Sequence, residues 1–208
     1  MSGTPPDRLA AALQQASASD RLQAALTAGT RPDPGFLEPL VARCAIEPDF
    51  FVRDMLTWAL TRFRVDEVLP RVIAELGSTI PQARSQALHT LSKLADPRGW
   101  PAITADHLHD PDDEVARSAW RAAASLVPFD ERDALAGALA AELGRGDLEV
   151  QRSLSRALLE LGDAGESAAA RAERAAGEPV RAHARATLRL FEDPDAAFFL
   201  EAGGPEEA

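Results

Sequence analysis

The sequence predicts an all-α fold, a right-handed solenoid of about six antiparallel helix pairs. One pattern recurs through most of the chain at intervals of 30 to 35 residues, and a period of this length is typical of stacked helical hairpins. Each recurring segment carries one apolar stripe at helical spacing, and no segment alternates apolar and polar residues as a strand would. The recurring segments start at Asp20, Val52, Ala83, Val115, Val150 and Val180.

The recurring segments are predicted to be amphipathic helices. In every segment the residues four and eight positions after the start are Ala or Leu. In the five later segments the residue eleven positions after the start is Leu or Phe. Residues at these offsets share one face of a helix, so that face is expected to be buried. Within it we expect Leu56, Leu91, Leu158 and Leu188 to lie in the core.

A partner helix is predicted beside each recurring helix. The six partner segments are 6–15, 34–46, 65–76, 97–108, 130–143 and 163–176. Helix starts are indicated where an aspartate precedes a proline, because the carboxylate can cap the helix and proline suits its first position. These pairs are Asp33-Pro34, Asp96-Pro97, Asp110-Pro111 and Asp193-Pro194. Helix ends are indicated by Gly77, Gly146, Gly162 and Gly177.

Composition favours many thin helix interfaces over one large core. Hydrophobic residues make up 46% of the chain but aromatic residues only 5%, and there is no tyrosine. The repeat runs on without a linker, which predicts a single domain over residues 6–202 and a disordered acidic tail over 203–208. No apolar leader or membrane-spanning run is present, so we expect a cytoplasmic protein, monomeric or weakly dimeric.

Motifs for catalysis and for cofactor or metal binding are missing from the sequence. There is no glycine-rich phosphate loop, nucleophile elbow or paired-cysteine zinc spacing. The lone Cys44 is predicted to be a buried small apolar residue. His107 and His109 diverge on a helix, so they are interpreted as residues of a helix end. We therefore assign no catalytic residue, no cofactor and no metal ligand.

Four stretches, 47–60, 81–97, 148–163 and 178–194, resemble bacterial HEAT or HEAT-like repeats of the phycobilisome-lyase type. In that family Val-Arg opens the second helix of a pair, Ala and Leu fill it, and Gly-Asp or Asp-Pro closes it. The resemblance implies second helices that line a concave binding face. It also implies a structural role for the early arginines, Arg21, Arg53, Arg84 and Arg181. Arg117 and Arg152 stand one position later, which interrupts this ladder of arginines.

The implied concave face is cationic although the chain carries a net charge of −11. Its cations are Arg62, Lys93, Arg117, Arg121, Arg152, Arg156 and Arg189, against the anions Asp54 and Glu160. This predicts a binding groove for an acidic protein or peptide, whereas the acidic balance argues against nucleic acid. The alternative is an ordinary solvated surface, with Asp113 paired to Arg117 and Glu160 to Arg156.

Trp58 and His89 are the other candidate groove residues. Trp58 stands off the core stripe between Asp54 and Arg62, where it either recognises a partner or covers a neighbouring repeat. His89 either binds an anion or is a tolerated polar surface residue. Trp100 and Trp120 are interpreted as packing between repeats.

Three functions follow, and a non-enzymatic scaffold or adaptor is the first. The second is a HEAT-like DNA glycosylase, to which the line of Asp54, Trp58 and Arg62 is similar. Net acidity and the presence of a single lysine, Lys93, argue against it. The third is a phycobilin-lyase-like protein that handles a chromophore, against which the few groove aromatics argue.

Overall fold

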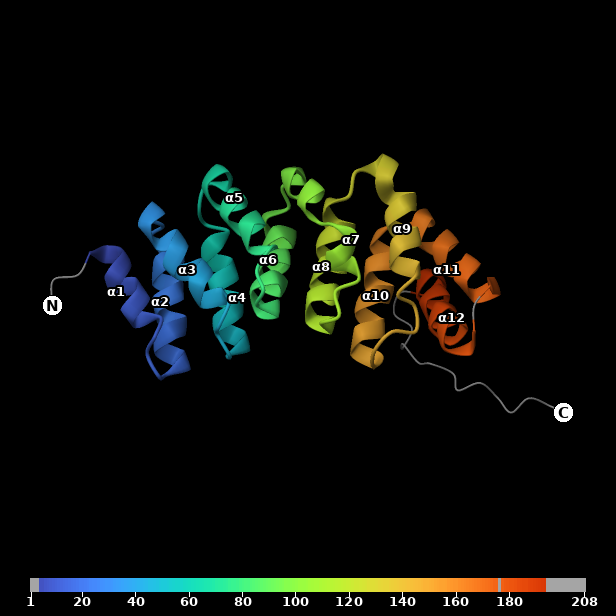
Figure 1. Cartoon of the computed structure of the whole chain (residues 1–208), viewed down its shortest axis with the longest axis horizontal. Coiled ribbons are helices and arrows are strands. Elements are labelled where there is room, and N and C mark those ends of the chain that lie inside the picture. The colour runs from blue at the N-terminus through green and yellow to red at the C-terminus, as the bar shows by residue number, and fades with distance from the viewer. Residues whose placement is uncertain (1–3, 176, 194–208) are drawn as a thin grey trace. The chain divides into compact units, whose positions relative to one another are not determined.

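The computed structural model describes residues 4–175 and 177–193, and every regular element within them is a helix (Figure 1). The predicted all-α class is therefore confirmed. The chain forms two compact units, Met1–Ala102 and Ile103–Ala208, each with its own core. The predicted tail, 203–208, lies outside the described residues.

The first unit consists of two rows of helices. Its elements are α1 (Pro5–Ala12), α2 (Ala18–Thr30), the 3-10 turn η1 (Pro34–Phe36), α3 (Leu37–Cys44), α4 (Phe50–Leu60), α5 (Val65–Glu75), α6 (Pro81–Leu94) and the 3-10 segment η2 (Pro97–Ala102). The recurring helices form one row, since α2 packs on α4 and α4 on α6. Helices α1 and α3 contact each other beside that row, and α5 packs against α6. Leu56, Leu60 and Leu91 are at most 2% exposed, as the apolar stripe predicted.

The second unit repeats this arrangement. Its elements are α7 (Ala105–Leu108), α8 (Asp113–Leu126), η3 (Phe129–Glu131), α9 (Arg132–Ala140), α10 (Leu148–Glu160), α11 (Asp163–Ala175) and α12 (Glu178–Glu192). Helices α8, α10 and α12 form one row and α7, α9 and α11 the other. Leu158 is fully buried, but the prediction for Leu188 was wrong, because it is only half-buried. Among the described residues α12 ends its row, so no further helix covers it.

Aspartate caps begin three of the recurring helices. The side chain of Asp49 accepts a hydrogen bond from the backbone N–H of Val52 (3.1 Å), and Asp147 accepts from Val150 (3.0 Å). The predicted cap at Asp110 was wrong. Asp112 caps α8 instead, accepting from Glu114 at 3.0 Å.

The predicted helix over 97–108 is broken into η2 and α7. Pro101 lacks an N–H to donate and disfavours helical backbone at the residue before it. The predicted helix breaks at Gly146 and Gly162 are confirmed, since both glycines have positive φ, 67° and 63°.

A buried carboxylate, Glu47, joins the helices of the first unit. It is 0% exposed and accepts two bonds from Arg21, at 2.7 and 2.8 Å, and one from Arg43 at 2.7 Å. Its backbone carbonyl accepts from Arg53 (3.0 Å) and from Gln82 of α6 (2.9 Å). Burial raises the pKa of Glu47, but the hydrogen bonds from the two arginines outweigh it and lower the pKa to about 2. Glu47 is therefore charged at neutral pH and binds side chains from α2 and α3.

The early arginines of the first unit have the expected structural role. Arg21, Arg53 and Arg84 each donate to a carbonyl of the loop before their own helix, at 2.8 to 3.0 Å. Arg181 of the second unit instead pairs with Glu178 at 2.8 Å.

In the second unit Arg145 ties neighbouring repeats together. It binds Asp113 at the start of α8 (2.8 Å) and Glu142 after α9 (2.8 Å), and it donates to the carbonyl of Asp110. Its guanidinium also lies 5.8 Å from the ring centre of Trp120, which is fully buried. The packing role predicted for Trp120 is thus confirmed.

His183 is the centre of a buried polar network in the second unit. The residue is 0% exposed; its Nδ1 accepts from the backbone N–H of Gly144 and its Nε2 lies 3.0 Å from the carbonyl of Gln151 and from Ser155 Oγ. Burial lowers the pKa of His183 to about 4. The neutral ring is therefore the form that fits.

Each of the substitutions Leu56→Ala, Leu91→Ala and Leu158→Ala is expected to lower the free energy of unfolding by roughly 2–5 kcal/mol, because each leaves a cavity in a packed helix interface. Leu188→Ala, at a half-buried site, is the matched control and should cost clearly less. Urea unfolding followed by circular dichroism measures the four values. Equal losses at all four sites would contradict the burial pattern.

The free energy of unfolding should fall as the pH falls from about 6.5 to about 4. In this window the unfolded state protonates His183, whose ordinary pKa is 6.5, while the folded state, with a pKa of about 4, does not. The loss should approach about 3 kcal/mol, since each pKa unit corresponds to about 1.4 kcal/mol. Urea unfolding at a series of pH values measures it, and His183→Gln should abolish this part of the pH dependence.

Candidate functional site

The helices α8 and α10 of the second unit enclose a hollow of about 440 Å³ that we call the arginine pocket. It is lined by Arg117, Arg121, Glu149, Arg152, Ser153, Arg156, Ala157 and Glu160. Four of the ten groove residues predicted from the sequence thus come together in one site. They do so because α8 and α10 pack side by side and each carries two arginines four residues apart.

Two arginines of the pocket are held by glutamates one turn earlier. Arg117 binds Glu114 at 2.7 Å and Arg152 binds Glu149 at 2.9 Å. The pairing of Arg117 with Asp113 considered above is not the one formed, because Asp113 binds Arg145 instead. Both glutamates are largely exposed, so these ion pairs orient the arginines and contribute little stability.

The other two arginines present like charges to the pocket. Partial withdrawal from water lowers the pKa of Arg121, and the positive charges of Arg117 and Arg156 lower it further. Arginine nevertheless stays protonated in proteins, so the repulsion persists at neutral pH. Arg156 is exposed and has no hydrogen bond or ion pair with another described residue, Glu160 included. Burial raises the pKa of Glu160, with the charge of Arg132 opposing.

In the first unit the predicted residues Asp54 and Trp58 lie on α4, and Arg62 lies in the turn just after it. The Arg62 guanidinium stacks 5.8 Å from the centre of the Trp58 ring. The Cζ3 and Cε3 atoms of that ring lie against Gly29 of α2, and a Cβ added at Gly29 would also lie 2.8 Å from the Cα of Ala59. Trp58, 37% exposed, therefore covers the junction of two repeats.

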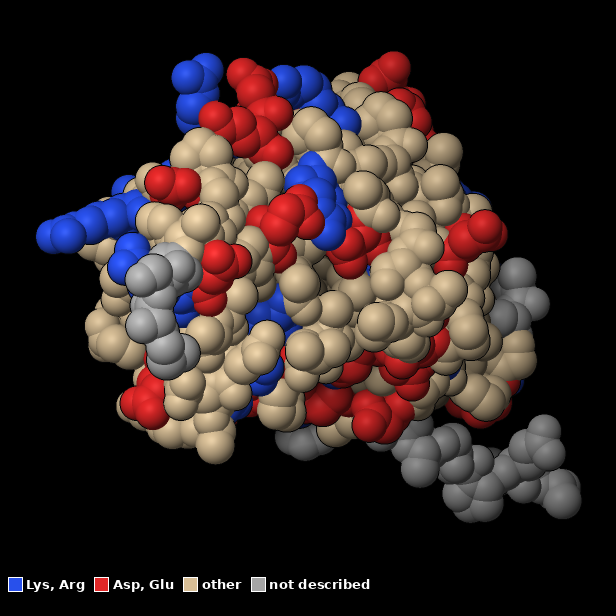
Figure 2. All heavy atoms as spheres, turned by 60° about the vertical axis from the view of Figure 1, so that its left-hand side comes forward, with Lys and Arg blue, Asp and Glu red and all other residues tan. Residues whose placement is uncertain are grey.

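The remaining predicted residues are scattered. His89 is half-buried and Lys93 exposed on α6, and Arg189 is half-buried on α12. On the face shown in Figure 2, basic and acidic side chains are interspersed and form no large cationic field.

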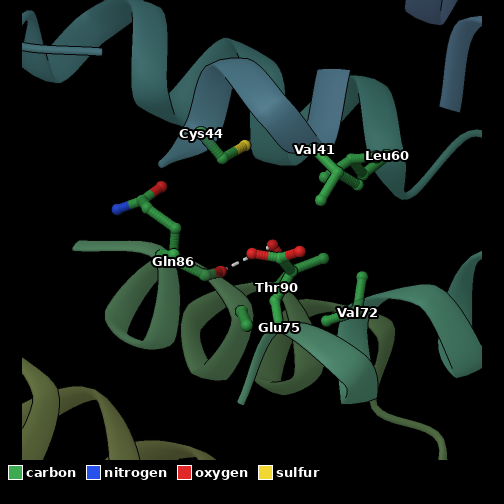
Figure 3. A pocket seen from close by; sticks show the side chains of 9 residues that line it. Val41, Cys44, Leu60, Val72, Glu75, Gln86 and Thr90 are labelled. Atoms are coloured by element: carbon green, nitrogen blue, oxygen red, sulfur yellow. Dashed lines mark hydrogen bonds between the residues drawn. The ribbon is translucent and has the colours of Figure 1, made fainter. Parts of the chain in front are cut away.

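Sequence reasoning missed one small cavity in the first unit (Figure 3). It measures about 10 Å³ and is lined by residues that include Cys44, Glu75, Gln86 and Thr90. The side-chain oxygen of Gln86 is buried without a hydrogen-bond partner. A cavity of this size holds about one water molecule and no larger ligand. Burial raises the pKa of the Cys44 thiol to about 12, as expected of an inert, buried cysteine.

The predicted helix-end histidines occupy the ends of α7. Nδ1 of His107 accepts from the backbone N–H of Thr104 at 3.1 Å, and His109 lies 2.6 Å from Glu142. The described residues contain no cluster of three or more His, Cys, Asp or Glu residues that could hold a metal ion. Nor do they contain a helix long and apolar enough to cross a membrane.

Two rows of stacked, antiparallel helices in each unit define the class of the protein as an α-solenoid. Residues 37–126 match the family model for HEAT repeats. This stretch of the chain is thus similar to HEAT repeats.

Solved structures share this fold at low sequence identity. The complex of CpcE and CpcF of phycocyanin lyase from Nostoc sp. is 18% identical with a TM-score of 0.50, covering 92% of this chain and 78% of that one. An engineered protein is 17% identical with a TM-score of 0.50, covering 91% and 99%. No curated protein sequence matches the chain.

Trp58→Ala is expected to lower the free energy of unfolding by about 3 kcal/mol, near the lower limit for a large aromatic residue because a third of the side chain is exposed. Arg62→Ala, which removes only the stacked guanidinium, should cost less than about 1 kcal/mol. Thermal and urea unfolding measure both. An unchanged stability of Trp58→Ala would favour the recognition role over the packing role.

Proposed function

We propose that this protein is a non-enzymatic scaffold or adaptor that binds an acidic segment of a partner protein in the arginine pocket. The observation that carries the proposal is the convergence of four guanidinium groups on one hollow of a chain with a net charge of −11. Among the acidic residues that the structure describes, only Glu149 and Glu160 line that hollow. The hollow therefore has a local positive charge, which attracts anions.

The chemistry of the pocket supports binding over catalysis. Guanidinium groups do not give up protons near neutral pH, so they serve as fixed hydrogen-bond donors. Their planar forks suit carboxylates, which accept two parallel hydrogen bonds from one arginine.

The overall charge supports a protein segment over a nucleic acid. A long polyanion would extend past the pocket, and the net charge of −11 of the chain would repel it. A short acidic segment confines its charge to the pocket. A tetrapyrrole chromophore would find no aromatic side chain in the lining on which to stack.

The test is the charge reversal Arg121→Glu with Arg156→Glu. It should weaken binding of a labelled oligoglutamate peptide at least tenfold and flatten the salt dependence of the remaining binding, because fewer charge pairs are formed. Fluorescence anisotropy at several salt concentrations measures both quantities.

The control makes the same charge change elsewhere in the unit. Arg71 is unsuitable because it binds Glu38 and Glu75. Arg171 and Arg174 of α11 are exposed and form no ion pair with another described residue, so Arg171→Glu with Arg174→Glu is matched in charge. If both double variants bind the peptide equally well, the arginine pocket is not the binding site.

A further inference from the structure

The arginine pocket carries an excess of positive charge. Four arginines line it against two glutamates, of which Glu149 is bonded to Arg152. Glu114, beside the lining, is bonded to Arg117, so the excess is about one charge. An anion with one or two negative charges on a compact group therefore suits it.

The positions of Arg121 and Arg156 favour one compact group. They occupy equivalent places on the adjacent helices α8 and α10, and the charge of Arg156 already acts on Arg121. Each side chain brings a fork of donors, and a carboxylate has two oxygens to share between two forks, as Glu47 does between Arg21 and Arg43. A phosphate monoester offers three oxygens and a charge of about −1.5 to −2 at pH 7, so it can accept from both arginines at once.

Building on the proposed function, we infer that the arginine pocket recognises a phosphorylated serine or threonine of the partner segment. Arg121 and Arg156 bind the phosphate oxygens between them. Arg117 and Arg152, held by Glu114 and Glu149, supply further positive charge at the sides.

The rest of the pocket suits a residue that carries the phosphate. The hydroxyl of Ser153 has no hydrogen bond to another described residue and can donate to a phosphate oxygen. Ala157 contributes only a small side chain to the lining, and a hollow of about 440 Å³ has room for neighbouring residues of a peptide as well.

The experiment compares three capped peptides that differ only at a central residue, which is phosphoserine, glutamate or serine, with inorganic phosphate as a fourth probe. Isothermal titration calorimetry with the full chain at pH 7.5 measures each affinity. We expect the phosphoserine peptide to bind at least tenfold more tightly than the glutamate peptide and the serine peptide to show no binding.

The pH dependence separates a dianion from a monoanion. The second pKa of a phosphate monoester is about 6, so affinity for the phosphoserine peptide should rise between pH 5 and 7.5 while that for the glutamate peptide does not. The acidic groups near the ligand are Glu114 on α8 and Glu149 and Glu160 on α10, with Arg132 of α9 near Glu160. Because the pKa of Glu160 is raised, the titration is repeated with Glu160→Gln, and the same rise assigns it to the ligand.

Variants test the role of the two forks. Arg121→Gln and Arg156→Gln should each weaken phosphoserine binding at least tenfold. Arg156→Lys keeps the charge but loses the planar fork, and should reduce the preference for phosphoserine over glutamate. Arg171→Gln is the control in the same unit, and circular dichroism melting confirms that each variant is folded.

The outcomes are distinguishable. Equal and pH-independent binding of the phosphoserine and glutamate peptides would overturn this inference and leave the proposed function standing. Inorganic phosphate binding as tightly as the phosphoserine peptide would assign the pocket to free phosphate and overturn the protein-segment assignment. Absence of binding by all the acidic probes would overturn the proposed function itself.

Discussion

The first unit depends on one buried charge. Glu47 has no exposure, and a carboxylate withdrawn from water is unfavourable unless several donors replace the lost hydration. Arg21 and Arg43 supply that replacement from two different helices, and the backbone N–H of Asp49 adds a third donor (2.9 Å). Because the Glu47 carboxylate must keep all three donors, these hydrogen bonds fix α2, α3 and the start of α4 relative to one another.

Arginine has two separate uses in this chain, and its place on the helix decides between them. Arg53 and Arg84 stand one residue after the start of a recurring segment. Their side chains donate to carbonyls of the preceding loop and so have a structural role. One residue later the helix has turned by ~100°, and Arg117 and Arg152 face the neighbouring helix across a hollow. A shift of one position thus separates the arginines that bind loop carbonyls from those that line the arginine pocket.

The periodic part of the structure could be predicted from the sequence, because burial at helical spacing needs only residue type and order. The structure contains the predicted recurring helices, and Leu56, Leu91 and Leu158 are buried as predicted. The sequence could not predict which of two suitably spaced carboxylates an arginine binds. Asp113 and Glu114 stand four and three residues before Arg117, but Asp113 binds Arg145 and Arg117 binds Glu114.

The candidate site was predictable only in part, for a related reason. The sequence placed the four pocket arginines on one face, since that follows from helix geometry. It could not show that the Trp58 ring packs against α2. This contact is possible only because Gly29 has no side chain there. Nor does a list of cations indicate which ones enclose a hollow.

The loop after α9 makes its repeat longer than the others, and the contacts of Arg145 hold this longer loop in place. The repeat that contains it, from Val115 to Val150, is the longest in the chain, yet α8 and α10 still pack together. One long side chain spans the loop and holds Asp113 and Glu142, so register is kept by ion pairs where the arginine ladder is interrupted. For protein engineering, any change of length in this loop must retain Arg145 with its two partners, and also the backbone N–H of Gly144 that donates to His183.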